Sequence, residues 1–143
     1  MAAYIQTALE MRTAFAVIDE ERDKVVGSTS LYHIDEAVRR ADIGFTWYAQ
    51  SARRTRINTC YKLMLLDYVF ETLGCVCAGW QTDILNTVSQ RAIERLGAKK
   101  DGVLRRHKLR KDGSVRDTVA YSMLREEWPQ AKAALEARLA AYL

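Results

Sequence analysis

Apolar residues alternate with polar ones in some segments of the chain and recur at helical spacing in others, so the pattern predicts both strands and helices. Glycine, Asn and Asp-Gly positions mark where the segments end. We predict strands at residues 13–19, 25–34, 42–48, 75–81, 102–110 and 114–124 and helices at 3–12, 59–73, 86–97 and 126–143. Each helix except the first and last joins two strands, which indicates one mixed α/β domain over residues 1–143.

Capping residues support the two central helices. Asn58 is suited to cap the first, and Gly74 stops it; Asn86 is suited to cap the second, and Gly97 stops it. A crossover helix makes the strands on either side of it parallel, so strands 42–48 and 75–81 should be parallel neighbours. Asp112-Gly113 predicts a hairpin between the last two strands.

The composition is that of a globular protein outside the membrane. Of 143 residues, 49% are hydrophobic and 28% are charged, and no apolar run approaches the ~20 residues of a membrane span. The N-terminus lacks the basic and apolar regions of a signal peptide, so we expect a cytoplasmic protein. The three cysteines, Cys60, Cys75 and Cys77, should be reduced thiols, with Cys75 and Cys77 on one face of a strand. They lack metal-ligand spacing, so we expect no metal.

Positive charge is clustered within a net charge of +4. Seven lysine and arginine residues lie within residues 99–111, which forms either a polyanion-binding patch or a solvated strand face. A second group, Arg53, Arg54 and Arg56, lies in the turn between strand 42–48 and its helix. Free backbone N–H groups and the helix dipole favour phosphate at such a turn. This turn is therefore a candidate anion site.

In their order along the chain, several segments resemble the GNAT acetyltransferases, and within them the branch that acetylates the N-termini of ribosomal proteins at alanine or serine. The matching segments are residues 43–48 (IGFTWY), 53–58 (RRTRIN), 86–89 (NTVS), 92–98 (AIERLGA), 101–105 (DGVLR), 112–113 (DG), 116–118 (RDT), 121–124 (YSML) and 127–129 (EWP). The resemblance implies a mixed, mostly antiparallel sheet with a splayed parallel strand pair and helices on both faces, the GNAT-like acyl-CoA N-acyltransferase fold.

Two features differ from the family pattern. Arg53 fits the first position of the phosphate-binding turn, but Arg56 and Asn58 stand where small residues are usual. The family also has a strand and a helix before the helix expected at residues 3–12, and we expect this chain to lack them. The edge of the sheet at residues 13–19 would then be unpaired, and unpaired edges recruit other chains. A homodimer that covers this edge is our hypothesis.

The resemblance implies acetyl-CoA as the cosubstrate and a primary amine as the acceptor, either a protein N-terminal α-amine or a small-molecule amine. By the same resemblance, the backbone of Phe45, Thr46 and Trp47 would bind pantetheine, and Asn86 would contact the cofactor. The pyrophosphate would lie on the turn formed by Arg53, Arg54, Thr55, Arg56, Ile57 and Asn58.

Two residues are candidates for proton transfer. By the resemblance, Ser89, three positions after Asn86, would contact the cofactor and protonate the leaving thiolate, although a serine there also suits a helix start. His107 is the candidate base that takes the proton of the amine, because histidine changes charge near neutral pH. His33 and Asp83 are alternatives for the base. As partners, we expect neither a membrane nor nucleic acid.

A second class of function stays open. A catalytically silent relative could use the basic patch at residues 99–111 to bind RNA or another polyanion. The strand aromatics precede a phosphate turn and a helix, rather than forming the exposed stacking platform of RNA-binding modules, and this order favours the enzyme.

Overall fold

The computed structural model describes residues 13–142, and the helix expected at residues 3–12 lies outside this range. The strands are β1 (Thr13–Asp19), β2 (Lys24–Asp35), β3 (Arg40–Tyr48), β4 (Cys77–Asp83), β5 (Lys99–Leu109) and β6 (Val115–Leu124). The helices are α2 (Arg56–Asp67), which continues as a π-turn to Thr72, α3 (Thr87–Arg95) and α4 (Trp128–Ala140), with short 3-10 turns at Gln50–Ala52 and Arg125–Glu127. None of the described helices is long and apolar enough to cross a bilayer.

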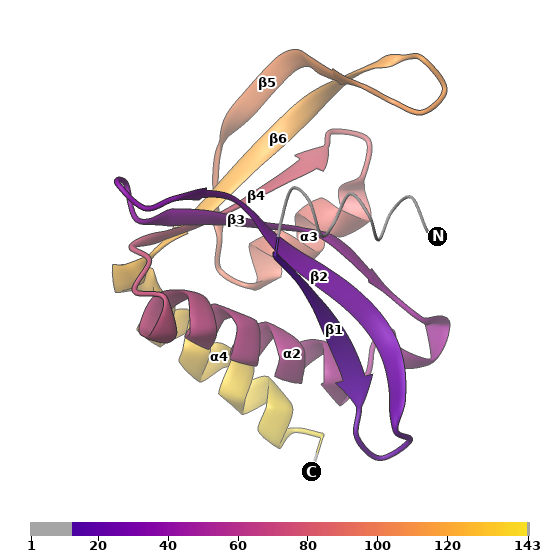
Figure 1. Ribbon diagram of the computed structural model, residues 1–143, viewed down its shortest axis with the longest axis vertical. Coiled ribbons are helices and arrows are strands. Elements are labelled where there is room, and N and C mark those ends of the chain that lie inside the picture. The colour runs from indigo at the N-terminus through magenta and orange to yellow at the C-terminus, as the bar shows by residue number, and fades with distance from the viewer. Residues whose placement is uncertain (1–12, 143) are drawn as a thin grey trace.

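The six strands form one sheet in the order β1-β2-β3-β4-β6-β5 (Figure 1). Every neighbouring pair is antiparallel except β3 and β4, which are parallel. This confirms the mixed, mostly antiparallel sheet and its parallel pair. Among the described strands, β1 forms one edge and β5 the other. The homodimer at the β1 edge stays a prediction.

The parallel strands β3 and β4 pair only over their first residues. Arg40, Ala41 and Asp42 pair with Cys77, Ala78 and Gly79, and no pair between the two strands follows. Residues 43–48 of β3 continue without a partner on β4, while residues 80–83 of β4 continue against β6. The two strands therefore separate after Asp42 and Gly79 and leave a wedge between them.

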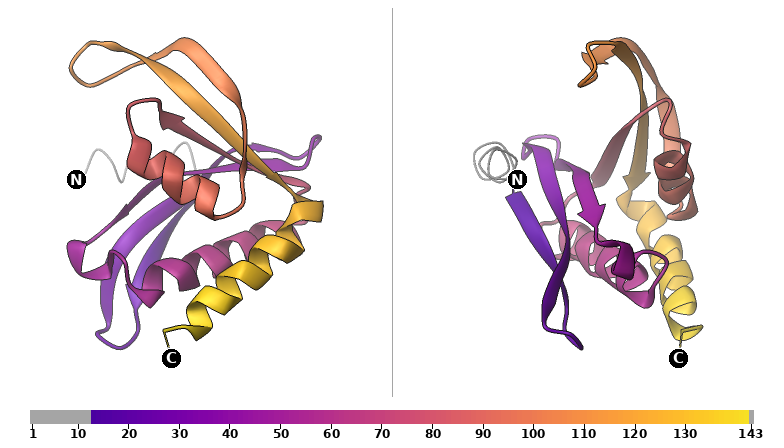
Figure 2. Two further views of the ribbon diagram at one scale, coloured as in Figure 1. Left: turned by 180° about the vertical axis from the view of Figure 1, so that it is seen from behind. Right: turned by 90° about the vertical axis from the view of Figure 1, so that its right-hand side faces the viewer.

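Helices α2, α3 and α4 cover one face of the sheet (Figure 2). Val119, Tyr121 and Met123 alternate along β6 and point into the same core as Leu66 of α2 and Trp128 of α4. The rings of Phe70 and Trp128 stack with centroids 5.7 Å apart. Among residues 13–142 the helices lie on this face alone, so the described part of the chain does not show the helices expected on the other face.

Two local predictions are wrong. Asn58 does not cap α2, because the helix already begins at Arg56 with Thr55 as its N-cap residue. Cys75 and Cys77 do not share a face: β4 begins only at Cys77, and Val76 lies in a bend before it. Cys75 therefore joins the helix-side core, whereas the Cys77 sulfur accepts from the Arg40 guanidinium on the other face at 3.5 Å. All three cysteines are free, as expected.

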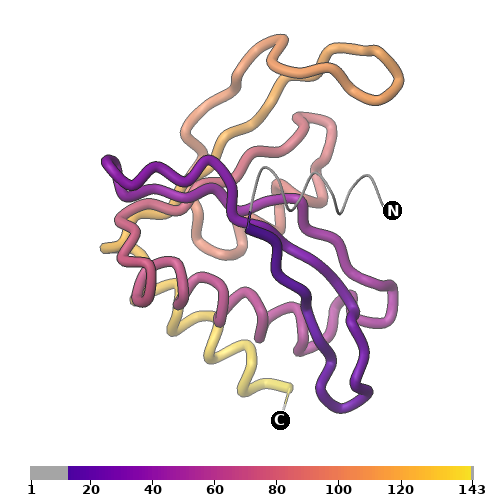
Figure 3. The backbone as a smooth tube through the Cα atoms, in the orientation of Figure 1, coloured from indigo at the N-terminus to yellow at the C-terminus, as the bar shows by residue number. Residues whose placement is uncertain are grey.

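The backbone trace shows the β5–β6 hairpin standing apart from the helices (Figure 3). Its turn at Asp112-Gly113 is the predicted one, with Gly113 at a φ of 87°. Gly74 and Gly97 also have positive φ, at 69° and 100°, directly after the helices that they were predicted to end. These conformations are open to glycine at little cost.

Candidate functional site

Beyond the point where it separates from β4, strand β3 contains a bulge in its pairing with β2. Ser28 of β2 pairs with Trp47 and Ser30 pairs with Gly44, so the register between the two strands shifts across Phe45 and Thr46. Phe45 has a φ of 51°, which is uncommon for a non-glycine residue and marks stored backbone strain. Bulges of this kind redirect backbone and side-chain groups next to functional sites. Phe45, Thr46 and Trp47 thus lie on the β3 side of the wedge.

The basic turn before α2 has its left-handed residue at Arg54, with a φ of 56°. In the described part of the chain, neither the Arg54 nor the Thr55 backbone N–H has a hydrogen-bond acceptor, so both remain donors at the helix start. Arg56 is the first helical residue, and its guanidinium pairs with Glu21. Positions 56 and 58 are right-handed helical, so the turn itself needs no glycine at either position.

A hollow of about 550 Å³ opens between this turn and α3. It is lined by Arg54 from the turn and by Val88, Arg91, Glu94 and Arg95 from α3. Three arginines and one carboxylate give the lining of this hollow a net positive charge. Sequence reasoning missed Arg91 and Arg95, although their i,i+4 spacing places them on one face of the helix that follows Asn86.

A half-buried lysine adds to the positive charge near the hollow. Lys62 of α2 lies near Arg95 of α3 and Arg138 of α4. Burial first, and then the repulsion of these two arginines, lowers the pKa of Lys62 to about 8. The fold thus holds several cations close together, and their mutual repulsion lowers its stability. An anion that binds among them offsets this repulsion.

Replacing Lys62 with Met should stabilise the unliganded protein by about 1–2 kcal/mol at pH 7, allowing for partial exposure. The lysine pKa is about 8 in the folded protein and 10.5 in the unfolded chain, so between these values the unfolded chain binds more protons. The free energy of unfolding of the wild type therefore rises between pH 8 and pH 10.5. The greater stability of Lys62→Met should be lost at pH 10.5.

Urea unfolding of both proteins at pH 7 and pH 10 measures this change. Lys24→Met at the exposed tip of the β1–β2 hairpin is the matched control, and it should show no pH-dependent difference. If Lys62→Met is more stable than the wild type by the same free energy of unfolding at both pH values, its effect does not come from the charge of Lys62.

Helix α3 begins as the sequence predicted. The Asn86 side chain accepts a hydrogen bond from the Ser89 backbone N–H at 3.0 Å, which confirms Asn86 as the N-cap. Within residues 13–142 the Ser89 hydroxyl has no hydrogen-bond partner. Ser89 is half-buried at a helix start, so its hydroxyl is free to contact a ligand.

Two of the candidate bases are Asp83, the last residue of β4, and His107 on β5. Asp83 forms a two-point ion pair with Arg110, at 2.7 and 2.9 Å, which holds the pKa of its carboxyl far below the usual range. A carboxylate held in this way is unsuited to accept a proton near neutral pH. His107 Nδ1 lies 2.9 Å from the Thr118 hydroxyl, and the Arg116 guanidinium donates to the same hydroxyl.

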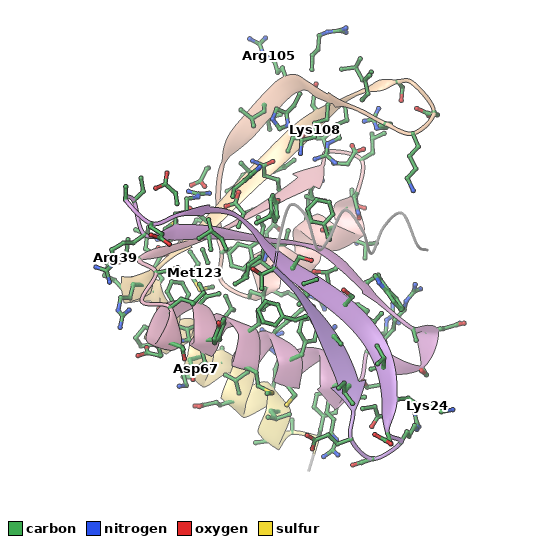
Figure 4. The ribbon with its side chains drawn as sticks, viewed as in Figure 1. Lys24, Arg39, Asp67, Arg105, Lys108 and Met123 are labelled. Atoms are coloured by element: carbon green, nitrogen blue, oxygen red, sulfur yellow. The ribbon has the colours of Figure 1, made fainter. Side chains whose placement is uncertain are left out.

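The basic segment 99–111 coincides with β5 and the turn after it. Lys99 pairs with Glu127 and Arg110 with Asp83, which assigns two of its seven cations a structural role. The other cations are exposed, and Arg105 and Lys108 extend from the hairpin (Figure 4). This surface is strongly basic.

The residues around the wedge fit coenzyme A. Its phosphates require cations and free N–H groups, which Arg54, Arg91 and Arg95 and the turn backbone supply. Its pantetheine arm carries amide N–H donors. Within the described residues, the buried side-chain oxygens Asn58 Oδ1 and Gln81 Oε1 have no hydrogen-bond partner, so both are acceptors in need of a donor. The sequence signalled Asn58 only as a helix cap.

Comparison with known proteins agrees with this geometry. The family model described as acetyltransferase (GNAT) domain matches residues 1–99. The chain is 33% identical over 106 residues to YdaF of Bacillus subtilis (strain 168), a protein named provisionally as a ribosomal N-acetyltransferase; the match covers 71% of this chain and 55% of YdaF. A crystal structure of a GCN5-related N-acetyltransferase from Brucella melitensis superposes with a TM-score of 0.91 at 34% identity, over 96% of this chain and 63% of that one.

A more distant likeness concerns the fold alone. A spermidine N-acetyltransferase SpeG chimera from Vibrio cholerae and hSSAT superposes with a TM-score of 0.74 at 18% identity, over 90% of this chain and 76% of that one. The chain spans little more than half the length of YdaF. The family match nevertheless includes the wedge, the basic turn and the start of α3. The chain belongs to the GNAT acetyltransferase family.

Proposed function

We propose that this protein transfers an acetyl group from acetyl-CoA to a primary amine. The observation that carries the proposal is the parallel pair that separates after Asp42 and Gly79, with a basic turn at the open end of the wedge. An extended pantetheine arm fits between two such strands in the manner of an additional strand. Family membership supports the same cosubstrate.

The residues divide into two binding groups in this proposal. The backbone of Phe45, Thr46 and Trp47 pairs with the pantetheine amides, because the neighbouring strand has moved away on that side. Asn86 contacts the same arm. The turn from Arg53 through Arg54, Thr55, Arg56 and Ile57 to Asn58 binds the pyrophosphate, with the Arg54 and Thr55 N–H groups as donors. Arg54 and the arginines of α3 offset the remaining phosphate charge.

The chemistry needs polarisation of the thioester carbonyl and a proton for the sulfur. A backbone N–H redirected by the bulge at Phe45 donates to the carbonyl oxygen, where negative charge develops. The amine nitrogen forms the new C–N bond and the C–S bond breaks. Ser89 donates its hydroxyl proton to the departing sulfur and regains one from the acylated nitrogen.

The acceptor that we favour is the α-amine of a protein N-terminus, with a small-molecule amine as the second candidate. The provisional ribosomal assignment in the name of YdaF supports the first. The exposed cations of the β5–β6 hairpin repel a polycation, which argues against a polyamine.

The test mixes the protein with acetyl-CoA and short peptides that carry a free N-terminal alanine or serine, and follows thiol release and the peptide mass. We expect a gain of one acetyl group on the free peptides and none on the same peptides already blocked at the N-terminus. Spermidine should be a poorer acceptor than either free peptide.

Calorimetric titration with acetyl-CoA separates this proposal from the silent-module alternative. Measurable binding with peptide acetylation supports the enzyme. Absence of binding at high acetyl-CoA, together with salt-sensitive RNA binding that coenzyme A does not compete, would overturn it in favour of the basic hairpin as the functional surface.

A further inference from the structure

The face of the sheet opposite the helices carries a cluster of polar and ionisable groups at the narrow end of the wedge. Asp42 and Arg40 of β3 and Tyr32 and His33 of β2 form it. The helices and the basic hollow occupy the opposite face. If the cofactor enters from the helix side, this second face is where an acceptor amine has room to approach.

Within the cluster, His33 is held by a buried carboxylate. His33 Nδ1 lies 3.2 Å from Asp42 Oδ2, and the Asp42 side chain is only 6% exposed, whereas that of His33 is 62% exposed. A carboxylate accepts, so the ring donates its Nδ1–H, and this leaves Nε2 as the free lone pair. Arg40 Nε donates to the other carboxylate oxygen at 3.2 Å and offsets the buried charge.

Glycines on this face make room for the cluster. A Cβ on Gly79 would collide with Asp42 Oδ1 and with the Arg40 guanidinium, and a Cβ on Gly44 would lie 2.7 Å from the Tyr32 ring. Asp42 and Gly79 are also the last residues paired across β3 and β4. The His33–Asp42 pair is therefore placed at the point where the wedge begins, beside the first residues of β3 that do not pair with β4.

The backbone of His33 is itself unusual. Its φ is 46°, and the register between β2 and β3 shifts between Tyr32 and Asp35. This irregularity turns the ring toward Asp42, although consecutive strand residues normally point to opposite faces. A non-glycine residue in this conformation is strained, and strain of this kind clusters at functional sites.

The other histidine has no comparable partner. His107 contacts a hydroxyl that is shared with Arg116, and in residues 13–142 no carboxylate contacts its ring. Asp83, the third candidate, is tied to Arg110. Of the three candidate bases, His33 alone combines an exposed ring nitrogen with a carboxylate that fixes the tautomer.

We propose that His33 is the general base that takes the proton of the acceptor amine, and that Asp42 is a positioning residue that orients its ring. The proposal deepens the acetyl transfer proposed above and rests on it. Of the three protons of the acceptor ammonium, one stays on the amide and one is delivered to the thiol through Ser89. The third passes to His33 Nε2 and then to water, which balances the reaction.

The first test compares His33→Gln and His107→Gln by the pH dependence of kcat/KM for a peptide with a free N-terminal alanine. Tyr32 stays neutral near neutral pH, because burial and then Asp42 raise its pKa to about 12, although Arg116 and Arg40 act in the opposite direction. We expect His33→Gln to lower kcat about 10–100-fold, with loss of the acidic limb of the profile and no change in acetyl-CoA affinity. His33→Ala should regain activity when imidazole is added.

Further variants separate the possible outcomes. Asp42→Asn should lower kcat and leave KM unchanged, whereas Glu36→Gln, a matched loss of an exposed carboxylate in the adjacent turn, should behave as wild type. Loss of the acidic limb in His107→Gln instead, or full activity of His33→Gln, would overturn the proposal. A large loss in Asp42→Asn with an active His33→Gln would make Asp42 itself the base and overturn it equally.

A readout that needs no turnover keeps this proposal distinct from the proposed function. The ¹⁵N NMR shifts of the His33 ring should show the proton on Nδ1 in the wild type and a mixture of tautomers in Asp42→Asn. If the wild type acetylates no amine, the proposed function fails while the tautomer result still stands. If the wild type is active and the tautomer is unaffected by Asp42→Asn, only the positioning by Asp42 is refuted.

Discussion

Replacing Arg54 with Glu should weaken acetyl-CoA binding about 100-fold. A charge-assisted hydrogen bond contributes about 1.5–3 kcal/mol, and the new carboxylate would also repel the phosphates. Arg54 lines the basic hollow and is the left-handed residue of the turn, so the substitution removes a cation from the centre of the site. Titration calorimetry at fixed ionic strength measures the effect.

Lys24→Glu is the control for Arg54→Glu, because it makes the same change in charge at the β1–β2 hairpin, outside the lining of the hollow (Figure 4). It should bind acetyl-CoA as the wild type does. Equal weakening in both variants would mean that net charge alone attracts the cofactor. Unchanged affinity in Arg54→Glu would remove the basic turn from the binding site.

Replacing Ser89 with Ala should lower kcat by about 10–100-fold and leave the affinity for acetyl-CoA within about threefold. The hydroxyl is proposed to protonate the departing sulfur, a step that contributes to turnover more than to binding. The cap of α3 survives the substitution, because Asn86 accepts from the backbone N–H of residue 89 rather than from its side chain. Steady-state kinetics and calorimetry together separate the two effects.

Thr87→Ala is the matched control, since it removes a hydroxyl from the same helix turn. It should retain wild-type turnover. A similar loss in Thr87→Ala and Ser89→Ala would point to disturbance of the helix start, and full activity of Ser89→Ala would exclude Ser89 as the proton donor.

Much of the fold could be predicted because its signals are local. The alternation at residues 13–19 gives β1 with its observed bounds, and the Asn86 cap and the Gly74 and Gly97 stops depend on backbone chemistry within a few residues. The start of α2 could not be predicted in this way. Thr55 and Asn58 are both good capping residues, and only the packing of the turn decides that the helix begins at Arg56.

The site was less accessible to sequence reasoning, because its parts meet only in the folded protein. The aromatic strand and the basic turn are consecutive, so the sequence placed them together. The hollow unites Arg54 with Arg91 and Arg95, which lie about forty residues further along. The contact between His33 and Asp42 depends on an irregular register of β2 on β3, which no periodicity predicts.

The short pairing of β3 with β4 has a consequence for the dynamics of the protein. Only three residue pairs join the half-sheet β1–β2–β3 to the half-sheet β4–β6–β5, so this seam has fewer backbone hydrogen bonds to resist local opening than the other junctions. Helices α2 and α4 and the shared core must then hold the two halves in register. A ligand bound along both walls of the wedge would cross-link the half-sheets, so occupancy and rigidity of the sheet are coupled.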